Sequence, residues 1–318
     1  MKQITILGGS GFLGSVLSDL LVRRKDCKVI ILDNKKKIPL LKNQKFINGS
    51  ILNEEKLTRE IFDIWPDAII NCAAISSPDL VDKNPELAFE VNVNAAHRLA
   101  LLANHIGSRF IHISSDMVFD GIKPIYRSTD TPNPLTEYGR QKLESEKKIL
   151  KAGDQIVVLR ITIVNGNSPS GQRSPHEKIL RFLKEEKQIL LFEDEIRQPC
   201  SVENVADVIV ELLERPQLNG IFHWSGNEKI SRYDLGLRIL DRFGLNPNYI
   251  TKGSSQSAEI QIGPRPKSLI FHLEPLASKL ITKPLGIDNQ LLELQIPKDL
   301  YEWYRNFADD PSVYIPKF

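Results

Sequence analysis

A tyrosine and a lysine four residues apart are the residues of this chain whose types and spacing best suit proton transfer. Tyr138 and Lys142 fall in one predicted helix, and this spacing places both side chains on the same helix face. An unperturbed phenol has a pKa of about 10 and is a slow proton donor or acceptor at neutral pH. A neighbouring ammonium group favours the phenolate and lowers that pKa. The pair could therefore protonate a carbonyl oxygen as hydride reaches its carbon.

A short apolar strand ends in polar residues upstream of this helix. Residues 110–113 have the pattern of a buried strand, and Ser114, Ser115 and Asp116 follow at its carboxyl end, where open α/β sheets place their ligands. Ser115 could hydrogen-bond the same substrate oxygen as Tyr138. Taken alone, Tyr-x-x-x-Lys is more often a pair on a helix surface. The strand end and a glycine-rich turn near the N-terminus favour a catalytic site instead.

That glycine-rich turn follows a predicted strand over residues 3–7 and opens a helix. Gly9, Gly11 and Gly14 form a G-x-G-x-x-G pattern, whereas Gly8, Gly11 and Gly14 form a G-x-x-G-x-x-G pattern. In either frame the glycines let the backbone turn sharply and approach a pyrophosphate, whose charge the helix N-terminus stabilises. The strand before the turn and the helix after it make the motif more specific than glycines alone.

Asp33 ends the second predicted strand, residues 28–32, nineteen residues beyond Gly14. A carboxylate at this place accepts hydrogen bonds from the adenosine ribose hydroxyls and repels a 2′-phosphate, which favours NAD. The lysines at residues 35–37 (Lys35, Lys36 and Lys37) could attract that phosphate and favour NADP, although a solvated loop explains them slightly better. We expect NAD(H) or NADP(H), with a slight preference for NAD(H).

Strands and helices alternate as far as residue 163. Helices are predicted over residues 54–64 and 85–106, and strands over residues 68–71 and 155–163. This alternation predicts an α/β fold with a Rossmann-type, doubly wound parallel sheet and helices on both faces. The regularity fades beyond Asn165. We therefore predict an NAD(P)-binding domain over residues 1–163, with a return segment near 198–224. A smaller C-terminal α/β substrate-binding part and a tail occupy residues 164–318.

Two further groups of residues are candidates for the cofactor site. Cys72, Ala73 and Ala74 follow the strand at residues 68–71, and small residues there would let a flat cofactor lie against the backbone. Plain packing at the strand end explains them as well. Asn92 interrupts the apolar stripe of the helix at residues 85–106, and a polar group near a buried face requires a partner. An ordinary exposed asparagine is nearly as good an explanation.

Composition excludes several classes of protein. The 318 residues are 41% hydrophobic and 26% charged, and the net charge of +2 gives no reason to expect nucleic-acid binding. No apolar run approaches the roughly 18 residues of a membrane span, and a strand at the N-terminus leaves no room for a signal peptide. Three widely spaced cysteines suggest reduced thiols in a cytoplasmic protein. The six histidines have no metal-ligand spacing, so we expect no metal.

With these residues assembled, the chain resembles the extended short-chain dehydrogenase/reductase superfamily and, within it, the dTDP-4-dehydrorhamnose reductase family. The resemblance runs from residue 1 to about residue 285 and rests on three motifs: the glycine turn, Tyr138 with Lys142, and Ser-Ser-Asp-Met-Val-Phe-Asp-Gly at residues 114–121. The third motif is specific to this branch. The regulatory beta subunit of methionine adenosyltransferase belongs to the same branch and is also similar at residues 222–228 and 265–266. Met117 and Ser50 depart from the family, which usually has tyrosine at the first position and often aspartate at the second.

The resemblance implies an NAD(P)H-dependent reductase of a nucleotide-linked 4-keto sugar. Ser115 takes the family's Ser/Thr position, Tyr138 is the general acid, and Lys142 also holds the nicotinamide ribose. Two alternatives stay open: an epimerase or dehydratase that keeps its NAD bound, and a non-catalytic NAD(P)-binding subunit that regulates a partner enzyme. A homodimer is compatible with each of them.

The predicted site residues form three sets. The catalytic residues are Ser115, Tyr138 and Lys142. The cofactor-binding residues are Gly8, Gly11, Phe12, Leu13, Gly14, Asp33, Cys72, Ala73, Ala74, Asn92, Tyr138 and Lys142. The expected substrate-binding residues are Ser114, Asp116, Arg160, Arg197 and Arg265. The arginines are included because a nucleotide diphosphate needs cations, although an arginine taken singly is more often structural.

Overall fold

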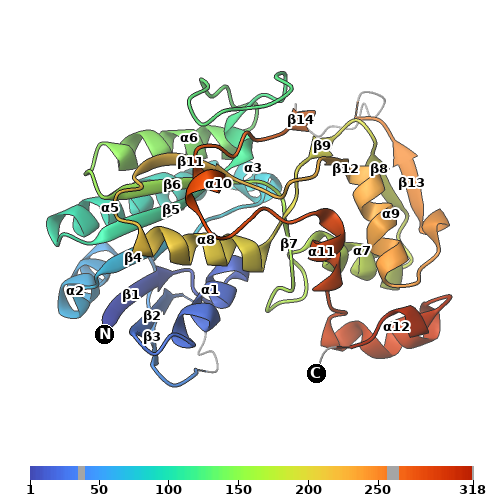
Figure 1. The fold of residues 1–318 in the computed structure, drawn as a ribbon, viewed down its shortest axis with the longest axis horizontal. Coiled ribbons are helices and arrows are strands. Elements are labelled where there is room, and N and C mark those ends of the chain that lie inside the picture. Colours follow the sequence, from blue (N-terminus) through green and yellow to red (C-terminus); the bar gives the residue numbers. More distant parts are fainter. Residues whose placement is uncertain (35–39, 256–264, 317–318) are drawn as a thin grey trace.

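A seven-stranded sheet forms the centre of the larger part of the molecule (Figure 1). The computed structural model describes residues 1–34, 40–255 and 265–316. All six neighbouring strand pairs are parallel, which confirms the prediction of a Rossmann-type sheet. The chain order changes direction between β1 and β4, the kind of switch point at which open α/β sheets bind ligands. In spatial order the strands are β11 (Gly220–Trp224), β6 (Ile156–Ile161), β5 (Arg109–Ser115), β4 (Ala68–Asn71), β1 (Lys2–Leu7), β2 (Cys27–Asp33) and β3 (Gln44–Asn48).

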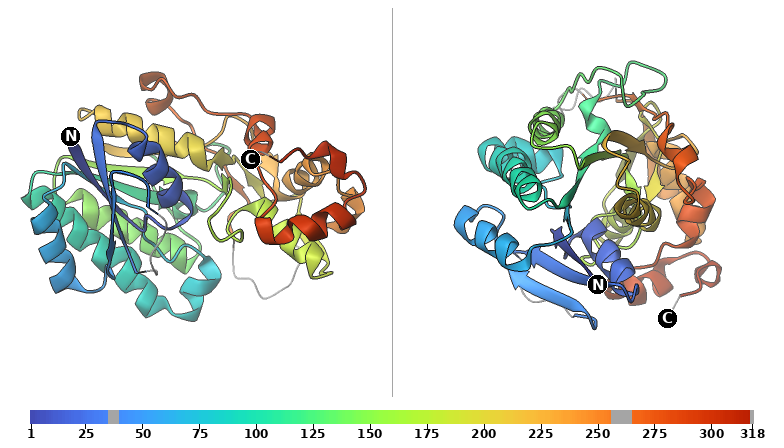
Figure 2. Two further views of the ribbon diagram at one scale, coloured as in Figure 1. Left: turned by 90° about the horizontal axis from the view of Figure 1, so that it is seen from below. Right: turned by 60° about the vertical axis from the view of Figure 1, so that its left-hand side comes forward.

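Helices cover both faces of this sheet, as the right-hand view of Figure 2 shows. Successive strand side chains point to opposite faces, so Ile31 packs in one apolar layer and its neighbour Ile30 in the other. The first layer is covered by α1 (Phe12–Val22) and α8 (Val202–Glu214), and the second by α2 (Glu54–Ile64), α5 (Ala96–His105) and α6 (Glu137–Leu150).

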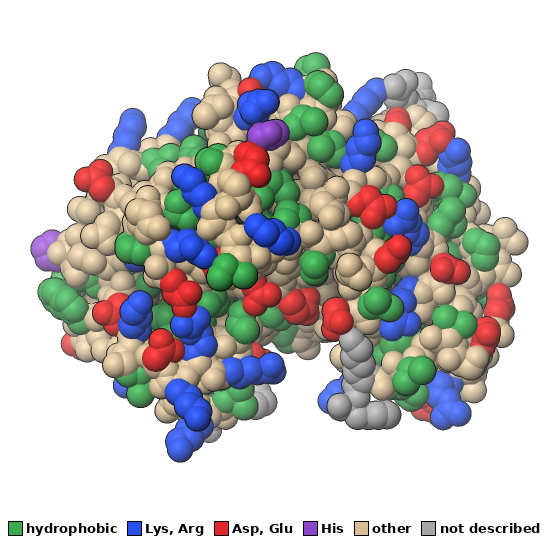
Figure 3. Space-filling view, viewed as in Figure 1, with side chains coloured by type: hydrophobic (Ala, Val, Ile, Leu, Met, Phe, Trp, Pro, Cys, Tyr) green, Lys and Arg blue, Asp and Glu red, His purple; other side chains and the backbone are tan. Residues whose placement is uncertain are grey.

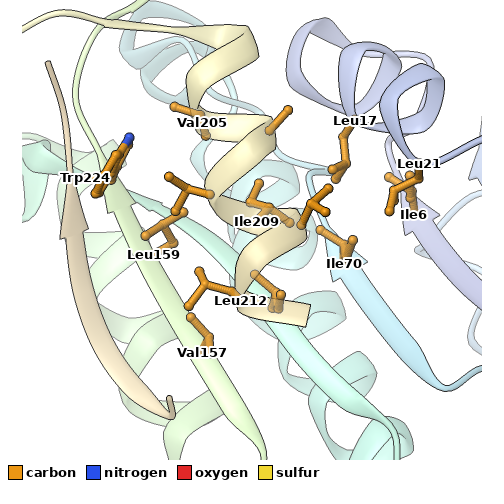
Figure 4. Close-up of a cluster of buried hydrophobic side chains, with 14 of the residues drawn as sticks. Ile6, Leu17, Leu21, Ile70, Val157, Leu159, Val205, Ile209, Leu212 and Trp224 are labelled. Carbon is orange, nitrogen blue, oxygen red and sulfur yellow. The ribbon is translucent and has the colours of Figure 1, made fainter. Parts of the chain in front are cut away.

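The last strand and helix of the sheet return from a distant part of the chain (Figure 4). Val205, Ile209 and Leu212 of α8 are fully buried with Leu159 of β6, and each such side chain contributes about 1.5–3 kcal/mol on burial. β11 pairs with β6, and the Trp224 indole donates a hydrogen bond of 2.9 Å to Asn204 Oδ1. The first 163 residues therefore do not complete their own sheet.

The second part of the molecule, at the right of Figure 1, has its own apolar core and short strands. β9 (Ile196–Arg197) lies between β12 (Ile230–Ser231) and β14 (Ser268–Leu269), β8 (Ile189–Phe192) pairs with β13 (Ile250–Gly253), and β7 (Val164–Asn165) pairs with β10 (Cys200–Ser201). The helices of this part are α7 (Pro175–Lys184), α9 (Arg232–Arg242), α11 (Ile287–Leu292) and α12 (Tyr301–Phe307), whereas α10 (Leu276–Lys279) packs against β11 of the large sheet.

The C-terminal segment differs from the predicted tail because part of it is packed. Tyr314 is buried in the core of the second part, and its hydroxyl accepts a hydrogen bond of 3.2 Å from the Ile296 N–H. Tyr314 thus closes one end of that core.

Two elements of the first part also differ from their predictions. β3 was not predicted, since its residues are mostly polar; it is an edge strand in which Ile47 alone is buried. The predicted helix at residues 85–106 is divided into α4 (Pro85–Phe89), a π-helical turn η1 (Glu90–Ala95) and α5. A π-helical turn redirects side chains, and functional sites often contain one. Lys35, Lys36 and Lys37, the alternative determinants of cofactor choice, lie outside the described residues.

Charged side chains of both signs are interspersed on the face seen in Figure 3, in keeping with a net charge of +2. Within the described residues, no helix is both long and apolar enough to cross a bilayer.

Candidate active site

Ser115 and Tyr138 come together at the carboxyl end of β5. Ser115 is the last residue of β5, and Tyr138 lies in the first turn of α6, where the Thr136 hydroxyl accepts a hydrogen bond of 3.1 Å from the Gly139 N–H. A Cβ at Gly139 would lie 2.2 Å from the carbonyl oxygen of Met117, so only glycine lets this turn approach the strand end so closely. This approach places both hydroxyls in one buried corner.

The environment of Tyr138 keeps its phenol protonated. Burial raises its pKa to about 12, although the Ser115 hydroxyl favours the phenolate. The expectation that Lys142 lowers this pKa is wrong for this structure, because the Lys142 amino group bonds to other atoms. A phenol that holds its proton at neutral pH is in the correct state to donate that proton.

Lys142 belongs to a buried group of polar side chains that we call the lysine cluster: Asn71, His112, Lys142 and Ser145. Lys142 Nζ donates to the Ile113 carbonyl oxygen at 2.6 Å and lies 3.0 Å from His112 Nε2. His112 Nδ1 lies 3.2 Å from Asn71 Nδ2. Burial lowers the pKa of Lys142 to about 8, opposed by Glu146 and Cys72. Burial and Lys142 hold the pKa of His112 well below its usual range. Lys142 therefore has no charged hydrogen-bond partner in this cluster.

The glycine turn, β2 and the end of β4 form a cradle of the shape that a dinucleotide requires. Gly8 has φ +70°, and a Cβ there would lie 2.9 Å from Ala73 N and Cα, so the two segments touch through backbone. Asp33 accepts hydrogen bonds from the backbone N–H (3.1 Å) and the hydroxyl (2.7 Å) of Ser10 in the turn. The turn leads into the N-terminus of the eleven-residue helix α1. These residues fit a pyrophosphate with an adjacent ribose.

Of the other predicted cofactor residues, four lie next to this cradle and one, Asn92, is directed elsewhere. Cys72 and Ala74 flank Ala73 at the end of β4, and Phe12 and Leu13 are half-buried at the start of α1. The Asn92 side chain is not directed to the cradle: it bonds the backbone of Ile75 at 2.9 and 3.1 Å and Gln141 Oε1 at 3.2 Å. The π-helical turn therefore fixes the segment that follows β4.

Ser114 and Arg160 lie in a second buried group, the ion-pair cluster: Ser114, Glu146, Arg160 and His223. Arg160 donates to both oxygens of Glu146, at 2.9 and 2.7 Å, and Ser114 donates to the same carboxylate. The Arg160 guanidinium also lies 5.1 Å from the centre of the Phe119 ring. Arg160 is 1% exposed, and in the structure its charge and the Ser114 hydroxyl are both engaged by the Glu146 carboxylate.

Arg197, Arg265 and Asp116 lie between the two parts of the molecule. Arg197 is buried, and its guanidinium donates to the backbone carbonyls of residues 196, 266 and 267 at 2.8–3.0 Å. Arg265 forms an ion pair of 3.2 Å with Asp79. Asp116 accepts a hydrogen bond of 3.1 Å from the Ser115 hydroxyl, and burial raises its pKa, opposed by Arg197. Asp116 thus lies beside Ser115, while both arginines have protein partners.

Three cations at this boundary were not predicted. Arg173 reaches across from the second part to donate a hydrogen bond of 2.6 Å to Ser76 Oγ. Burial and the nearby Arg197 lower the pKa of Arg232, and burial, Arg232 and Arg173 lower that of Lys178. Within the described residues, the side chains of Arg232 and Lys178 have no hydrogen-bond or ion-pair partner. One sequence signal was available: Arg232 is the first residue of α9, where the helix dipole disfavours a cation.

Comparison with known proteins identifies the family of this chain. The sequence profile of the RmlD substrate binding domain matches residues 1–293. The chain belongs to this family. A dTDP-4-dehydrorhamnose reductase from Aggregatibacter actinomycetemcomitans is 30% identical over 247 residues, which are 76% of this chain and 79% of that protein. The predicted family resemblance is confirmed.

The beta subunit of methionine adenosyltransferase 2 from Bos taurus is 36% identical over 211 residues, 65% of this chain and 63% of that protein. The chain thus spans less than two thirds of the length of this relative. Among solved structures, a dTDP-4-dehydrorhamnose reductase from Bacillus anthracis in complex with NADP has the same fold, with a TM-score of 0.80 and 24% identity over 91% of this chain and 97% of that one.

Proposed function

We propose that this protein is an NAD(P)H-dependent reductase of a nucleotide-linked 4-keto sugar that acts in the cytoplasm. The observation that carries the proposal is the corner formed by Ser115 and Tyr138 beside the glycine cradle, with buried Lys142 behind it. The reductase relative and the NADP in the solved structure of the same fold support it.

In this proposal the cradle holds the cofactor, which supplies hydride when bound. Gly8, Gly11 and Gly14 admit the pyrophosphate, and Asp33 faces the adenosine ribose. Ser115 hydrogen-bonds the keto oxygen of the substrate, and Tyr138 transfers its proton to that oxygen. Lys142 holds the nicotinamide ribose, as the family resemblance implies. When protonated, its ammonium group also stabilises the phenolate that Tyr138 becomes after it gives up its proton.

Cations at the boundary would hold the diphosphate of the substrate. Arg232 and Lys178 are the best candidates, since neither has a protein partner among the described residues. Arg173 lies close enough to Tyr138 to influence its pKa and would join them. Asp116 would also contact the substrate, whereas Arg160 would not, because its charge is already paired with Glu146.

Nucleotide-linked 4-keto sugars mixed with the protein and NADH or NADPH test this proposal, with nicotinamide absorbance as the readout. At least one sugar should be reduced, and Tyr138→Phe should lower turnover by about 10²–10⁴-fold with little change in cofactor affinity. Tyr249→Phe, a matched change in the second part, should leave turnover intact. Turnover of Tyr138→Phe close to that of the parent would refute the assignment of Tyr138.

A second candidate function is a cofactor-binding subunit that regulates a partner enzyme. It is favoured by the 36% identity to the methionine adenosyltransferase 2 beta subunit. In this case no keto sugar would oxidise either cofactor, while added protein would change the kinetics of a methionine adenosyltransferase. An epimerase or dehydratase would instead convert its sugar without net consumption of NADH.

A further inference from the structure

The orientation of the Asn71 side chain decides where the proton on His112 lies. The backbone N–H of Ala73 donates a hydrogen bond of 3.1 Å to Asn71 Oδ1. The amide nitrogen of Asn71 therefore faces His112 Nδ1, at 3.2 Å. An amide nitrogen only donates, so Nδ1 must accept. His112 is neutral, because burial and Lys142 hold its pKa well below its usual range. The single ring proton is consequently on Nε2.

A proton on Nε2 constrains the charge of Lys142. Two atoms lie within reach of this N–H: Lys142 Nζ at 3.0 Å and Ser145 Oγ at 3.3 Å. An ammonium group has no lone pair to accept a hydrogen bond, whereas an amine has one. The shorter contact is therefore a hydrogen bond only when Lys142 is neutral.

A charged Lys142 requires the opposite arrangement. Its ammonium group donates to His112 Nε2, which places the ring proton on Nδ1. Asn71 must then turn its amide over, so that Oδ1 accepts from Nδ1 and no longer from the Ala73 N–H. Ala73 N lies 2.9 Å from the position of a Cβ on Gly8, at the wall of the cofactor cradle.

We propose that Asn71 and His112 form a proton-coupled link between Lys142 and the cofactor cradle, with His112 as a positioning residue. When Lys142 is neutral, the Ala73 N–H is bound to Asn71. When Lys142 is charged, that N–H is released beside the glycine turn. This link rests on the proposed function only in taking the cradle as the cofactor site. The charged and titratable groups that face Lys142 are His112 from β5, Glu146 from α6 and Cys72 from the end of β4.

Nitrogen NMR of histidine-labelled protein without cofactor tests the link directly. The His112 signals are assigned by their loss in His112→Gln. His112 should stay neutral but move its proton from Nδ1 to Nε2 as the pH rises through the pKa of Lys142, about 8. A ring that keeps one tautomer from about pH 6 to about pH 10 would overturn the proposal. Ser145→Ala should keep the exchange. Loss of the exchange in that variant would show that the hydroxyl accepts, and would overturn the role of Lys142.

The effect on the cradle is measured by titration of NADH across the same pH range. Affinity of the parent should fall about tenfold per pH unit above the pKa of Lys142, because the form with a released Ala73 N–H becomes rare. In Asn71→Asp one carboxylate oxygen accepts from the Ala73 N–H and the other from His112 Nδ1–H, so the Ala73 N–H is never released, and affinity should stay at the low level of the parent at high pH, nearly independent of pH. A loss of affinity that keeps the pH dependence of the parent would indicate a merely structural role. Neither measurement needs turnover. The link can therefore be tested, and refuted, even if the protein reduces no sugar.

Discussion

Two neighbouring groups of buried polar side chains lie between α6 and β5, and they differ in how their charges are paired. In the ion-pair cluster, Arg160 and Glu146 neutralise each other through two hydrogen bonds. In the lysine cluster, Lys142 contacts only neutral groups, and burial moves its pKa towards neutrality. A matched buried pair maintains the fold, whereas an unmatched buried cation is ready to change its charge or its partner.

The same substitution in the two clusters should separate these roles, and Lys142→Met is expected to have the larger effect on catalysis. It removes a buried charge without stranding another, so thermal stability should be retained or increased. Turnover should fall by about 10²–10⁴-fold, the usual contribution of acid–base machinery. Steady-state rates and thermal unfolding check this. A variant that is clearly less stable than the parent but keeps its turnover would reverse the comparison.

Arg160→Met should do the reverse and destabilise the protein by about 3–5 kcal/mol, because it leaves the Glu146 carboxylate buried without a cation. Denaturant unfolding measures the loss, and NADH titration of the folded fraction should show nearly unchanged affinity. Adding Glu146→Met should recover much of the stability, since the second change removes the stranded charge. No recovery in the double variant would mean that the packing of Arg160 on Phe119 matters more than its charge.

Stability should depend on pH through Lys142. Its pKa is lowered from 10.5 to about 8 in the folded protein, so between these values the unfolded chain binds more protons than the folded one. The free energy of unfolding should therefore rise with pH across this window, by about 3 kcal/mol in total from this group. The difference between the parent and Lys142→Met isolates this contribution from that of other titrating groups. A constant difference would show that Lys142 has an ordinary pKa.

The smallest effect is expected at the boundary between the two parts. Arg232→Ala should raise the substrate KM by about 10–100-fold, the loss of one charged hydrogen bond, without changing stability. Arg238→Ala is the matched control, because Arg238 lies on the same helix with exposed ion pairs to Glu228 and Asp288. Equal KM values for the two variants would remove Arg232 from the substrate site.

The parts of the molecule that follow from local pattern could be predicted from the sequence. The glycine turn, Asp33 at the end of β2 and the spacing of Tyr138 and Lys142 each depend on a few adjacent residues. β3 was missed because an edge strand with one buried side chain has no apolar signature. The fold class could be predicted from the alternation of strands and helices alone.

Partners from distant segments could not be predicted. An arginine near an active site can bind an anion or a buried carboxylate, and Arg160 and Arg232 are distinguished only once Glu146 is seen beside the first. The state of Tyr138 was misjudged for the same reason, since the Ile113 carbonyl and His112 hold Lys142. Local spacing brought the residues together but did not determine their hydrogen bonds.

The late arrival of α8 and β11 has a consequence for synthesis of the chain. Until residue 224 has left the ribosome, β6 is an open strand edge and the apolar face of α1 lacks its cover. A fragment of residues 1–163 should therefore aggregate or require a chaperone, although it contains most of the catalytic and cradle residues. A premature stop before residue 224 therefore disables the first part as well, so such truncations cannot be used to divide the activity of this protein between its two parts.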